Sequence, residues 1–180
     1  MAEFQHLEHA FDPVFDEHSR VLVLGSFPSV LSRENTFYYG NPRNRFWSVI
    51  AGITGNPVPP DMPLVESVRR KTALLLESHI ALWDVVASCD IRGSSDASIC
   101  NVTPCDIELV LRQAPIEAIF TNGGTATRLY ARYLEPVCGR GTIGLPSTSP
   151  ANARYPLVLL LERWGEALGP HLVDGATSFG

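Results

Sequence analysis

The stretch Val21-Leu-Val-Leu-Gly-Ser-Phe-Pro-Ser29 joins a buried-strand pattern to a tight turn. Its first four residues are branched and apolar, which is typical of a strand covered on both faces, as in a parallel sheet. Gly25 and Pro28 then favour a turn, because glycine accepts unusual backbone angles and proline fixes its own φ. We expect the backbone N–H groups of Ser26 and Phe27 to lack strand partners and to be free to hydrogen-bond a ligand carbonyl. A plain strand-to-loop turn is the alternative.

The stretch Tyr38-Tyr-Gly-Asn-Pro-Arg-Asn-Arg-Phe-Trp47 reads as a polar loop that leads into a helix. Tyr38 and Tyr39 lie where an aromatic ring can stack on a flat ligand such as a nucleic-acid base, or where one ring can pack beneath the loop. Asn44 falls near the first turn of the helix. Its amide can cap that helix, orient a water molecule or hydrogen-bond a base edge, and these alternatives stay open.

The rest of the chain alternates predicted strands and helices. We predict strands over 80–86, 116–121 and 142–145, and helices over 43–53, 64–79, 106–112, 125–134 and 151–168. Ser88 to Pro104 has no convincing period and is predicted to be a surface loop. This alternation predicts an α/β fold, a three-layer α/β/α sandwich with a central four-stranded, mainly parallel sheet. We expect one domain over 20–170, an N-terminal leader over 1–19, and a C-terminal tail over 171–180 that could be disordered.

Ligands of parallel sheets bind at the carboxyl ends of the strands, where the unusual loops of this chain are expected to meet. Besides the turn after Gly25, these loops are 84–88, 122–124 and 147–149. Asn122 can contact a ligand there, or it can simply form a turn with the two glycines that follow. Ser147, Thr148 and Ser149 stand at the predicted entrance to the last helix, which favours an anion such as phosphate, with N-capping by Ser149 as the alternative.

Composition narrows the function. The 180 residues are 45% hydrophobic and 18% charged, and no apolar run reaches the length of a membrane span, so we expect a soluble, monomeric protein. The N-terminus lacks the pattern of a secretion signal, and we interpret the protein as cytoplasmic. The net charge of −5 argues against a broad basic surface for nucleic acid. Arg33, Arg43 and Arg45 nevertheless form a local group that can hold one or two phosphates.

Several common chemistries lack their motifs. The chain has no dinucleotide fingerprint, no phosphate-binding P-loop and no nucleophile elbow around a serine. The four cysteines show no zinc spacing, so we predict no metal site and no cofactor. The five histidines stand in the leader or at helix ends and indicate no catalytic role.

Taken together, the motifs resemble the uracil-DNA glycosylase superfamily and, within it, the branch of hypoxanthine-DNA glycosylases, also called DNA-deoxyinosine glycosylases. The resemblance covers about residues 20 to 168 and is carried by the segments 25–29, 38–47, 122–124 and 146–151. It implies a monofunctional enzyme that flips a damaged nucleotide out of DNA and hydrolyses its N-glycosidic bond in base excision repair, without metal or cofactor. The superfamily often has Asp or Asn where Phe27 stands, and the resemblance to the hypoxanthine branch transfers the catalytic role to Asn44.

We therefore assign predicted roles as follows. Asn44 is the catalytic residue that places water near the anomeric carbon, and Phe27 and Tyr39 stack on the flipped base. The predicted substrate-binding residues are Gly25, Ser26, Phe27, Pro28, Tyr38, Tyr39 and Asn122. The predicted contacts to DNA phosphates come from Arg43, Arg45, Ser147, Thr148 and Ser149. Hypoxanthine is the first candidate base, with uracil and xanthine as further candidates.

Two rival functions fit the same predicted fold. The first is a small-molecule hydrolase acting on a nucleotide or an ester through Ser26, Ser147 or Ser149, although the sequence nominates no base beside any of them. The second is a DNA-binding module in which the loops hold phosphate but no water is positioned. Base release, activity on a free nucleoside and binding without cleavage separate the three.

Overall fold

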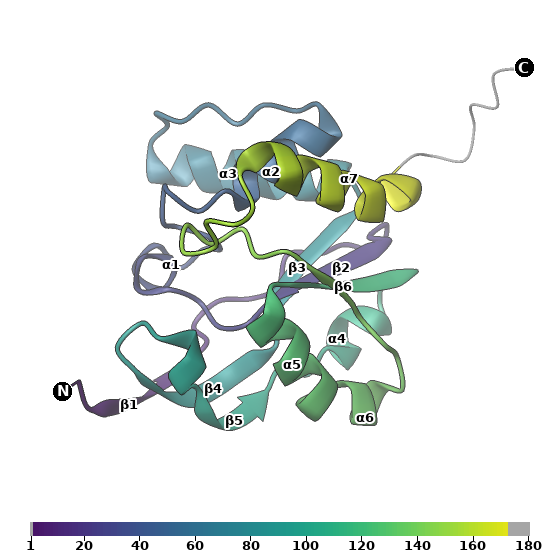
Figure 1. Cartoon of the computed structure of the whole chain (residues 1–180). Helices are drawn as coiled ribbons and strands as arrows, with labels where there is room; N and C mark the ends of the chain where they lie inside the picture. Colours follow the sequence, from purple (N-terminus) through teal and green to yellow (C-terminus); the bar gives the residue numbers. More distant parts are fainter. Residues whose placement is uncertain (1, 173–180) are drawn as a thin grey trace, which may run out of the picture.

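A four-stranded parallel sheet forms the centre of the molecule, which is described by a computed structural model over residues 2–172 (Figure 1). Its strands run in the order β3-β2-β6-β7, and every neighbouring pair is parallel. The strands are β2 (Val21–Gly25), β3 (Ile80–Asp84), β6 (Ala118–Asn122) and β7 (Ile143–Leu145). The predicted central sheet is confirmed.

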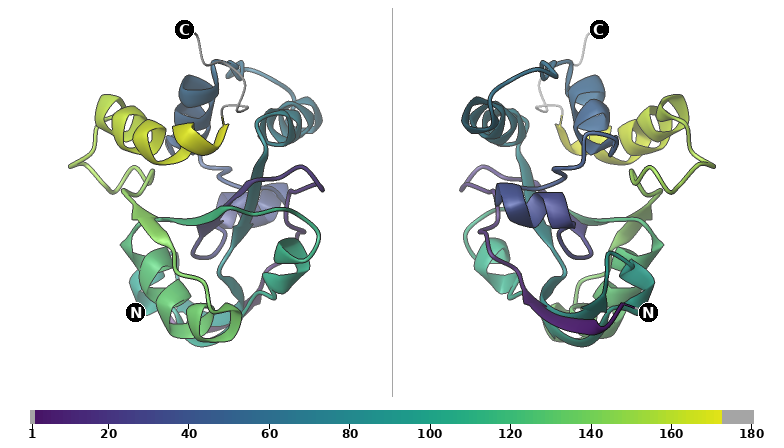
Figure 2. Two further views of the ribbon diagram at one scale, coloured as in Figure 1. Left: turned by 90° about the vertical axis from the view of Figure 1, so that its right-hand side faces the viewer. Right: turned by 90° about the vertical axis from the view of Figure 1, so that its left-hand side faces the viewer.

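Helices cover both faces of this sheet, as the views in Figure 1 and Figure 2 show. One layer consists of α2 (Phe46–Thr54), α3 (Leu64–Glu77) and α7 (Leu157–Leu172). The opposite layer contains α4 (Glu108–Leu111), α5 (Gly124–Tyr133) and α6 (Glu135–Cys138). The predicted three-layer α/β/α sandwich is therefore confirmed.

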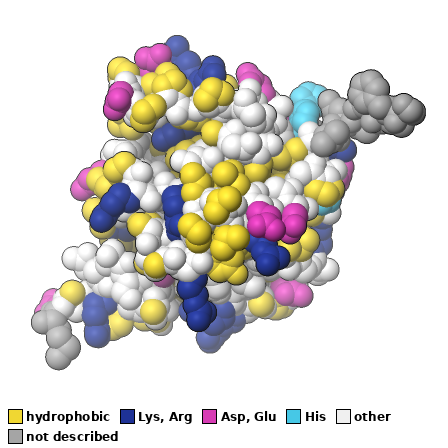
Figure 3. Space-filling view, turned by 45° about the horizontal axis from the view of Figure 1, so that its top comes forward, with side chains coloured by type: hydrophobic (Ala, Val, Ile, Leu, Met, Phe, Trp, Pro, Cys, Tyr) yellow, Lys and Arg dark blue, Asp and Glu magenta, His cyan; other side chains and the backbone are white. Residues whose placement is uncertain are grey.

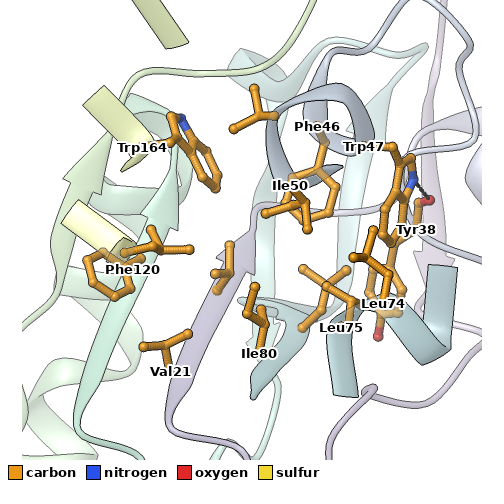
Figure 4. Packing of buried hydrophobic residues seen from close by; sticks show 14 of the residues in the cluster. Val21, Tyr38, Phe46, Trp47, Ile50, Leu74, Leu75, Ile80, Phe120 and Trp164 are labelled. Atoms are coloured by element: carbon orange, nitrogen blue, oxygen red, sulfur yellow. Dashed lines mark hydrogen bonds between the residues drawn. The ribbon is translucent and has the colours of Figure 1, made fainter. Parts of the chain in front are cut away.

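Alternate residues of β2 supply the two halves of the core. Val21 and Val23 pack with the α2, α3 and α7 layer, whereas Leu22 and Leu24 pack against the opposite layer, and all four are fully buried. This follows from the two-residue period of a strand, and it explains why the sequence is continuously apolar here. In the first half, the Trp47 Nε1–H donates to the Tyr38 carbonyl oxygen at 3.1 Å (Figure 4).

A second, antiparallel sheet was not predicted. It has the order β1-β4-β5 and consists of β1 (Phe4–Glu8), β4 (Val86–Arg92) and β5 (Cys100–Pro104), at the lower left of Figure 1. The predicted leader over 1–19 contains the strand β1, and the prediction of a surface loop over 88–104 was wrong for the residues of β4 and β5. Register shifts near Ser88 break the alternation of β4, so no clear two-residue period is visible in the sequence. Only η1 (Asp96–Ser98) and its flanks remain a connection between the strands.

Several element boundaries also differ from the prediction. The short helix α1 (Val30–Asn35) was not predicted, and α2 begins at Phe46 rather than at residue 43. The last helix begins at Leu157, not near residue 151, because a loop ending at Pro156 precedes it. At its other end α7 includes His171 and Leu172; the remainder of the predicted tail, 173–180, lies outside the described residues. No helix within residues 2–172 is long and apolar enough to cross a bilayer.

Candidate active site

A pocket of about 670 Å³ opens at the carboxyl ends of the parallel strands. Its lining comes from the turn after β2, from Tyr38 and Tyr39, from Asn44, and from the residues that end β3 and β6, together with the loop after β7. The segments singled out in the sequence therefore meet in space. The volume lies within the ~300–1,000 Å³ typical of small-ligand sites, and it is large enough for a nucleobase. Neither Arg43 nor Arg45 lines it.

Gly25 is the point where two strands and a tyrosine approach most closely. It pairs with Asp84 across the β2–β3 ladder. A Cβ atom at Gly25 would lie 2.3 Å from Asp84 Oδ1 and 3.0 Å from the Tyr39 hydroxyl oxygen. Real Cβ atoms do not approach an oxygen so closely, so only glycine fits without displacing both side chains.

The turn after Gly25 presents the two backbone donors that the sequence predicted. Within residues 2–172, no acceptor is recorded for the N–H groups of Ser26 and Phe27, although the Ser26 carbonyl accepts from Val86 N at 3.1 Å. The Phe27 ring lines the pocket and is otherwise buried. Arg33 also lines the pocket and holds the turn, because its Nη1 donates to the Pro28 carbonyl at 3.0 Å and its guanidinium lies over the Phe27 ring. The Arg33 side chain is thus used to hold the turn.

The two tyrosines take different positions. Tyr38 is 2% exposed, packs in the core and donates its hydroxyl proton to the Asp12 carbonyl at 2.7 Å, so most of its ring is unavailable for the predicted stacking on a ligand. Tyr39 has a φ of 52°, in the left-handed region that bulky residues rarely adopt. One face of its ring stacks on Phe46 with centroids 4.0 Å apart. This conformation brings the Tyr39 hydroxyl to the pocket floor.

Burial raises the pKa of both tyrosine hydroxyls above the ordinary value, and the Asp84 carboxylate raises both further. Tyr39 therefore stays protonated in the neutral range. Its oxygen accepts from Asn122 Nδ2 at 3.0 Å, and no acceptor is recorded for its proton within residues 2–172. The hydroxyl is consequently a hydrogen-bond donor available to a ligand.

A chain of hydrogen bonds connects Asn122 to the start of α2. Both N–H groups of the Asn122 amide are used, one on Tyr39 at 3.0 Å and one on Thr148 Oγ1 at 2.9 Å, while its Oδ1 accepts from Thr148 N at 3.0 Å. Thr148 Oγ1 in turn donates to Asn44 Oδ1 at 2.8 Å, and the same Asn44 oxygen accepts from Phe46 N at 2.9 Å. We call this series of hydrogen bonds the amide relay; its members are Tyr39, Asn122, Thr148, Asn44 and Phe46.

The amide relay changes how two predicted residues can act. Asn122 has no N–H donor left to read a ligand edge, so it holds the relay together. Asn44 has its oxygen satisfied by two donors, which leaves only the Nδ2–H₂ donors of its amide for the pocket that it lines. It also caps the first turn of α2, one of the alternatives left open from the sequence.

The predicted phosphate-binding residues separate into two groups. Thr148 is fully buried within the amide relay, so its side chain does not reach a DNA backbone as predicted. Arg45 donates to the carbonyl oxygens of Thr148, Ser149, Asn152 and Tyr155, which fixes the loop after β7 from within. Neither position matches the predicted phosphate role.

Ser147 and Ser149 keep partly accessible positions in that loop, but they do not stand at a helix entrance as predicted, because α7 begins only at Leu157. The Ser147 hydroxyl accepts from Ser149 N at 3.2 Å, and the Ser149 hydroxyl accepts from Ala151 N at 3.2 Å. Each hydroxyl keeps its proton for another acceptor. The Arg43 side chain is exposed and has no recorded polar partner within the described residues.

Sequence reasoning missed Asp84 of the pocket and its hydrogen-bond partner His9. Asp84 ends the apolar strand β3 and lines the pocket, and His9, in the predicted leader, donates from Nε2 to Asp84 Oδ2 at 2.7 Å. The side chains are only 4% and 6% exposed for His9 and Asp84. Asp84 could have been found from the sequence, because it is a carboxylate at the end of an apolar, buried strand. Nothing local pointed to His9, which is 75 residues away in sequence.

A second carboxylate, that of Asp96 in η1, also lines the pocket. Its Oδ2 accepts from the Ser26 hydroxyl at 2.9 Å. Desolvation by surrounding protein atoms raises the pKa of Asp96, and the hydrogen bond from Ser26 opposes that shift. Within residues 2–172 the structure contains no group of three or more His, Cys, Asp or Glu arranged to hold a metal ion.

Comparison with known proteins gives a consistent result. The family model described as the uracil DNA glycosylase superfamily matches residues 13–164. A hypoxanthine DNA glycosylase from Methanosarcina acetivorans is 32% identical over 83% of this chain and 90% of its own length. One from Methanosarcina barkeri is 31% identical over 89% of this chain and 97% of its own length.

A solved structure resembles the fold as well. It is a solution NMR structure from Methanosarcina acetivorans, provisionally assigned as a uracil DNA glycosylase, with a TM-score of 0.71 and 33% sequence identity. The alignment covers 90% of this chain and 96% of that one. The similarity therefore extends over most of the fold.

Proposed function

The chain belongs to the uracil DNA glycosylase superfamily and is a DNA glycosylase, and we propose that it releases hypoxanthine from DNA as the first step of base excision repair. Hypoxanthine ranks first because the curated relatives are named for it; uracil and xanthine are the other candidates. The observation that carries the proposal is the pocket itself, in which an asparagine amide, two free backbone N–H groups and a tyrosine hydroxyl face one base-sized space.

Base flipping supplies the first part of the mechanism. A deaminated base pairs poorly and costs less to unstack, so the enzyme extrudes it more readily than a normal base. The extruded base enters at the mouth of the pocket and stacks on Phe27, whose ring is held by Arg33. Stacking on an aromatic ring typically contributes about 1–3 kcal/mol per base.

Asn44 acts on the nucleophile. Its oxygen is fixed by Thr148 and by the N-terminus of α2, so the orientation of the amide is set before the substrate arrives. The Nδ2–H₂ donors then hold the oxygen of a water molecule beside the anomeric carbon. Positioning of this kind avoids the entropic cost of organising the reactants during the reaction.

Aimed donors stabilise the departing base. As the N-glycosidic bond breaks, the sugar gains positive charge and the base gains negative charge. Ser26 and Phe27 line the pocket, and their backbone N–H groups have no competing acceptor recorded within residues 2–172, so we assign them to the departing base. A preorganised donor in a water-poor site typically contributes about 3–4 kcal/mol to transition-state stabilisation.

Few side chains are available for the DNA backbone. On the face drawn in Figure 3, Lys and Arg side chains are interspersed with acidic and hydrophobic ones, in keeping with the net charge of −5. We assign phosphate contacts to the exposed Arg43 and to the hydroxyls of Ser147 and Ser149, which follow the pocket edge. Arg45 and Thr148 support this edge from inside.

The experiment is a base-release assay on matched duplexes that carry a single deoxyinosine, deoxyuridine or deoxyxanthosine. Alkali converts each abasic site to a strand break, and we expect breaks at the lesion without added metal, fastest with deoxyinosine. Binding without breaks on all three duplexes would support a DNA-binding module instead, and hydrolysis of a free nucleoside or ester would support the small-molecule hydrolase.

A further inference from the structure

The pair of Asp84 and His9 is the most enclosed titratable pair at the pocket, and the mechanism above does not use it. His9 Nε2 donates to Asp84 Oδ2, so that oxygen is occupied and its partner Oδ1 is left for the pocket. Asp84 lines the pocket, whereas His9 lies behind it. The exposed pair His6–Asp90, with 2.8 Å between its atoms, has similar chemistry but lies on β1 and β4, outside this pocket.

Asp84 Oδ1 and the Tyr39 hydroxyl lie next to each other. Both oxygens are within 3.0 Å of the single point where a Cβ of Gly25 would sit. One is an acceptor, because an ionised carboxylate has no proton to give. The other is a donor with no recorded acceptor within residues 2–172. The pocket floor thus presents an acceptor beside a donor.

Deamination changes the edge of a base in a matching way. Adenine and cytosine carry a ring nitrogen with a lone pair next to an amino group, so they present an acceptor beside a donor. Hypoxanthine and uracil carry a ring N–H next to a carbonyl, so they present a donor beside an acceptor. A site that selects the deaminated form therefore needs an acceptor for the N–H and a donor for the carbonyl.

We propose that Asp84 and Tyr39 read the deaminated edge, with Asp84 Oδ1 accepting the ring N–H and the Tyr39 hydroxyl donating to the adjacent carbonyl. The proposal rests on the proposed function and specifies how that pocket recognises its substrate class. It also explains Gly25, since any side chain there would occupy the meeting point of the two groups.

His9 is a positioning residue in this arrangement. The rings of Phe11, Phe27 and Tyr38 surround its imidazole, and no hydrogen-bond partner is recorded for its Nδ1 within residues 2–172. The proton of a neutral imidazole therefore belongs on Nε2, where it meets Asp84. This hydrogen bond fixes which carboxylate oxygen faces the pocket.

Asp84→Asn tests the proposal sharply. His9 would retain the amide oxygen of the new side chain as its acceptor, which turns the amide N–H₂ group toward the pocket. The acceptor for the ring N–H becomes a donor. Sites that hydrogen-bond a substrate group commonly reject an analogue that cannot pair by about 10⁴-fold, so we expect base release from a deoxyinosine duplex to fall by at least ~100-fold.

The distinguishing readout is discrimination and not rate alone. Duplexes carrying deoxyinosine or purine 2′-deoxyriboside, which lacks both the carbonyl and the ring N–H, are compared by their Kd for protein disabled by Asn44→Ala. We expect this protein to prefer deoxyinosine, and we expect Asp84→Asn on the same background to abolish the preference. His9→Phe should weaken the preference, and His9→Gln, which keeps a donor, should restore part of it.

Asp90→Asn is the matched control, because it makes the same change in an aspartate–histidine pair outside the pocket; we expect rate and preference to be unchanged. If Asp84→Asn slows base release but keeps the preference for deoxyinosine, Asp84 acts on water or on the fold and the proposal is overturned. Should Asp84→Asn fail to fold, an unchanged preference in His9→Phe overturns it equally. Absence of base release from all three lesions by the unaltered protein would instead remove the proposed function, and this inference with it.

Discussion

The two walls of the pocket differ in how far their polar groups are satisfied. On one wall the amide relay uses both N–H groups of Asn122, the hydroxyl of Thr148 and the oxygen of Asn44 within the protein. On the opposite wall the N–H groups of Ser26 and Phe27 and one oxygen of Asp84 have no partner recorded within residues 2–172. Buried polar groups are normally paired, so the unpaired wall indicates where a ligand binds. We propose that the first wall holds the site rigid and that the second recognises the ligand.

A substitution at Gly25, where the two walls meet, should have the largest effect on the site. We expect Gly25→Ala to reduce base release by ~100-fold or more, because its Cβ displaces both Asp84 Oδ1 and the Tyr39 hydroxyl, and displacements near 1 Å cost about that much. Single-turnover rates measure the loss. Gly169→Ala is the control, since its added Cβ meets open space within α7. Equal rates for both variants would show that the close approach at Gly25 has no functional consequence.

Asn44→Ala tests the amide of the satisfied wall that keeps its N–H₂ donors for the pocket. We expect base release to fall by ~10²–10³-fold, the usual effect of losing one aimed donor, while DNA binding stays near that of the unaltered protein. Asn44→Asp separates the two roles of the residue, because it keeps the oxygen that caps Phe46 N and removes the N–H₂ donors. Activity retained in Asn44→Asp, or equal loss of binding and release in Asn44→Ala, would reduce Asn44 to a capping residue.

Tyr39→Phe removes the pocket donor at the end of the amide relay, together with the acceptor that the hydroxyl offers to Asn122. Since a hydrogen bond to a neutral group is usually weaker than one in the catalytic step, we expect a ~10-fold loss of base release from deoxyinosine duplexes. Burial raises the pKa of Tyr39, so the hydroxyl keeps its proton above the pH at which an exposed tyrosine ionises. The activity lost in Tyr39→Phe should therefore be present in the unaltered protein up to pH 10. A fall in the rate of base release centred near pH 10 in the unaltered protein, absent from Tyr39→Phe, would contradict this. Tyr133→Phe on α5 serves as the control.

Arg43→Ala should have the smallest effect, because its side chain is exposed and does not line the pocket. We expect DNA binding to weaken several-fold and the slope of log K against log salt to become shallower by about 0.9, the value for one lost phosphate contact. The rate of base release at saturating protein should not change. Arg112→Ala, at the residue that follows α4, should leave both quantities unaltered, and a slope identical in the two variants would remove Arg43 from the DNA contacts.

Much of the fold could be predicted because local pattern determined it. The apolar run of β2 and the alternation of strands and helices are sufficient for a parallel sheet with helices on both faces. The second sheet could not be predicted, since the register shifts of β4 disrupt its period and β1 is a short, mostly exposed strand. The start of α7 was misplaced because residues 151–155, after Pro150, contain no glycine or proline, and the helix begins only after Pro156.

The site was predictable as a set of segments and not as a set of roles. The composition of the turn after Gly25 and of the loop with Asn44 indicated that both segments belong to the site. The partners of Arg45 are more than 100 residues away, so a guanidinium that holds carbonyl oxygens looked like one that holds phosphate. His9 contributes through an aspartate 75 residues distant, and no spacing in the sequence reveals that contact.

The most direct test of hypoxanthine release is a single-turnover reaction in which both products are quantified from one deoxyinosine duplex. Free hypoxanthine is measured by chromatography and abasic sites by alkaline cleavage, with the unaltered protein in excess. We expect the two products to rise together, in equal amounts, to one per duplex. Abasic sites without free hypoxanthine, or neither product from a duplex that the protein binds, would contradict it.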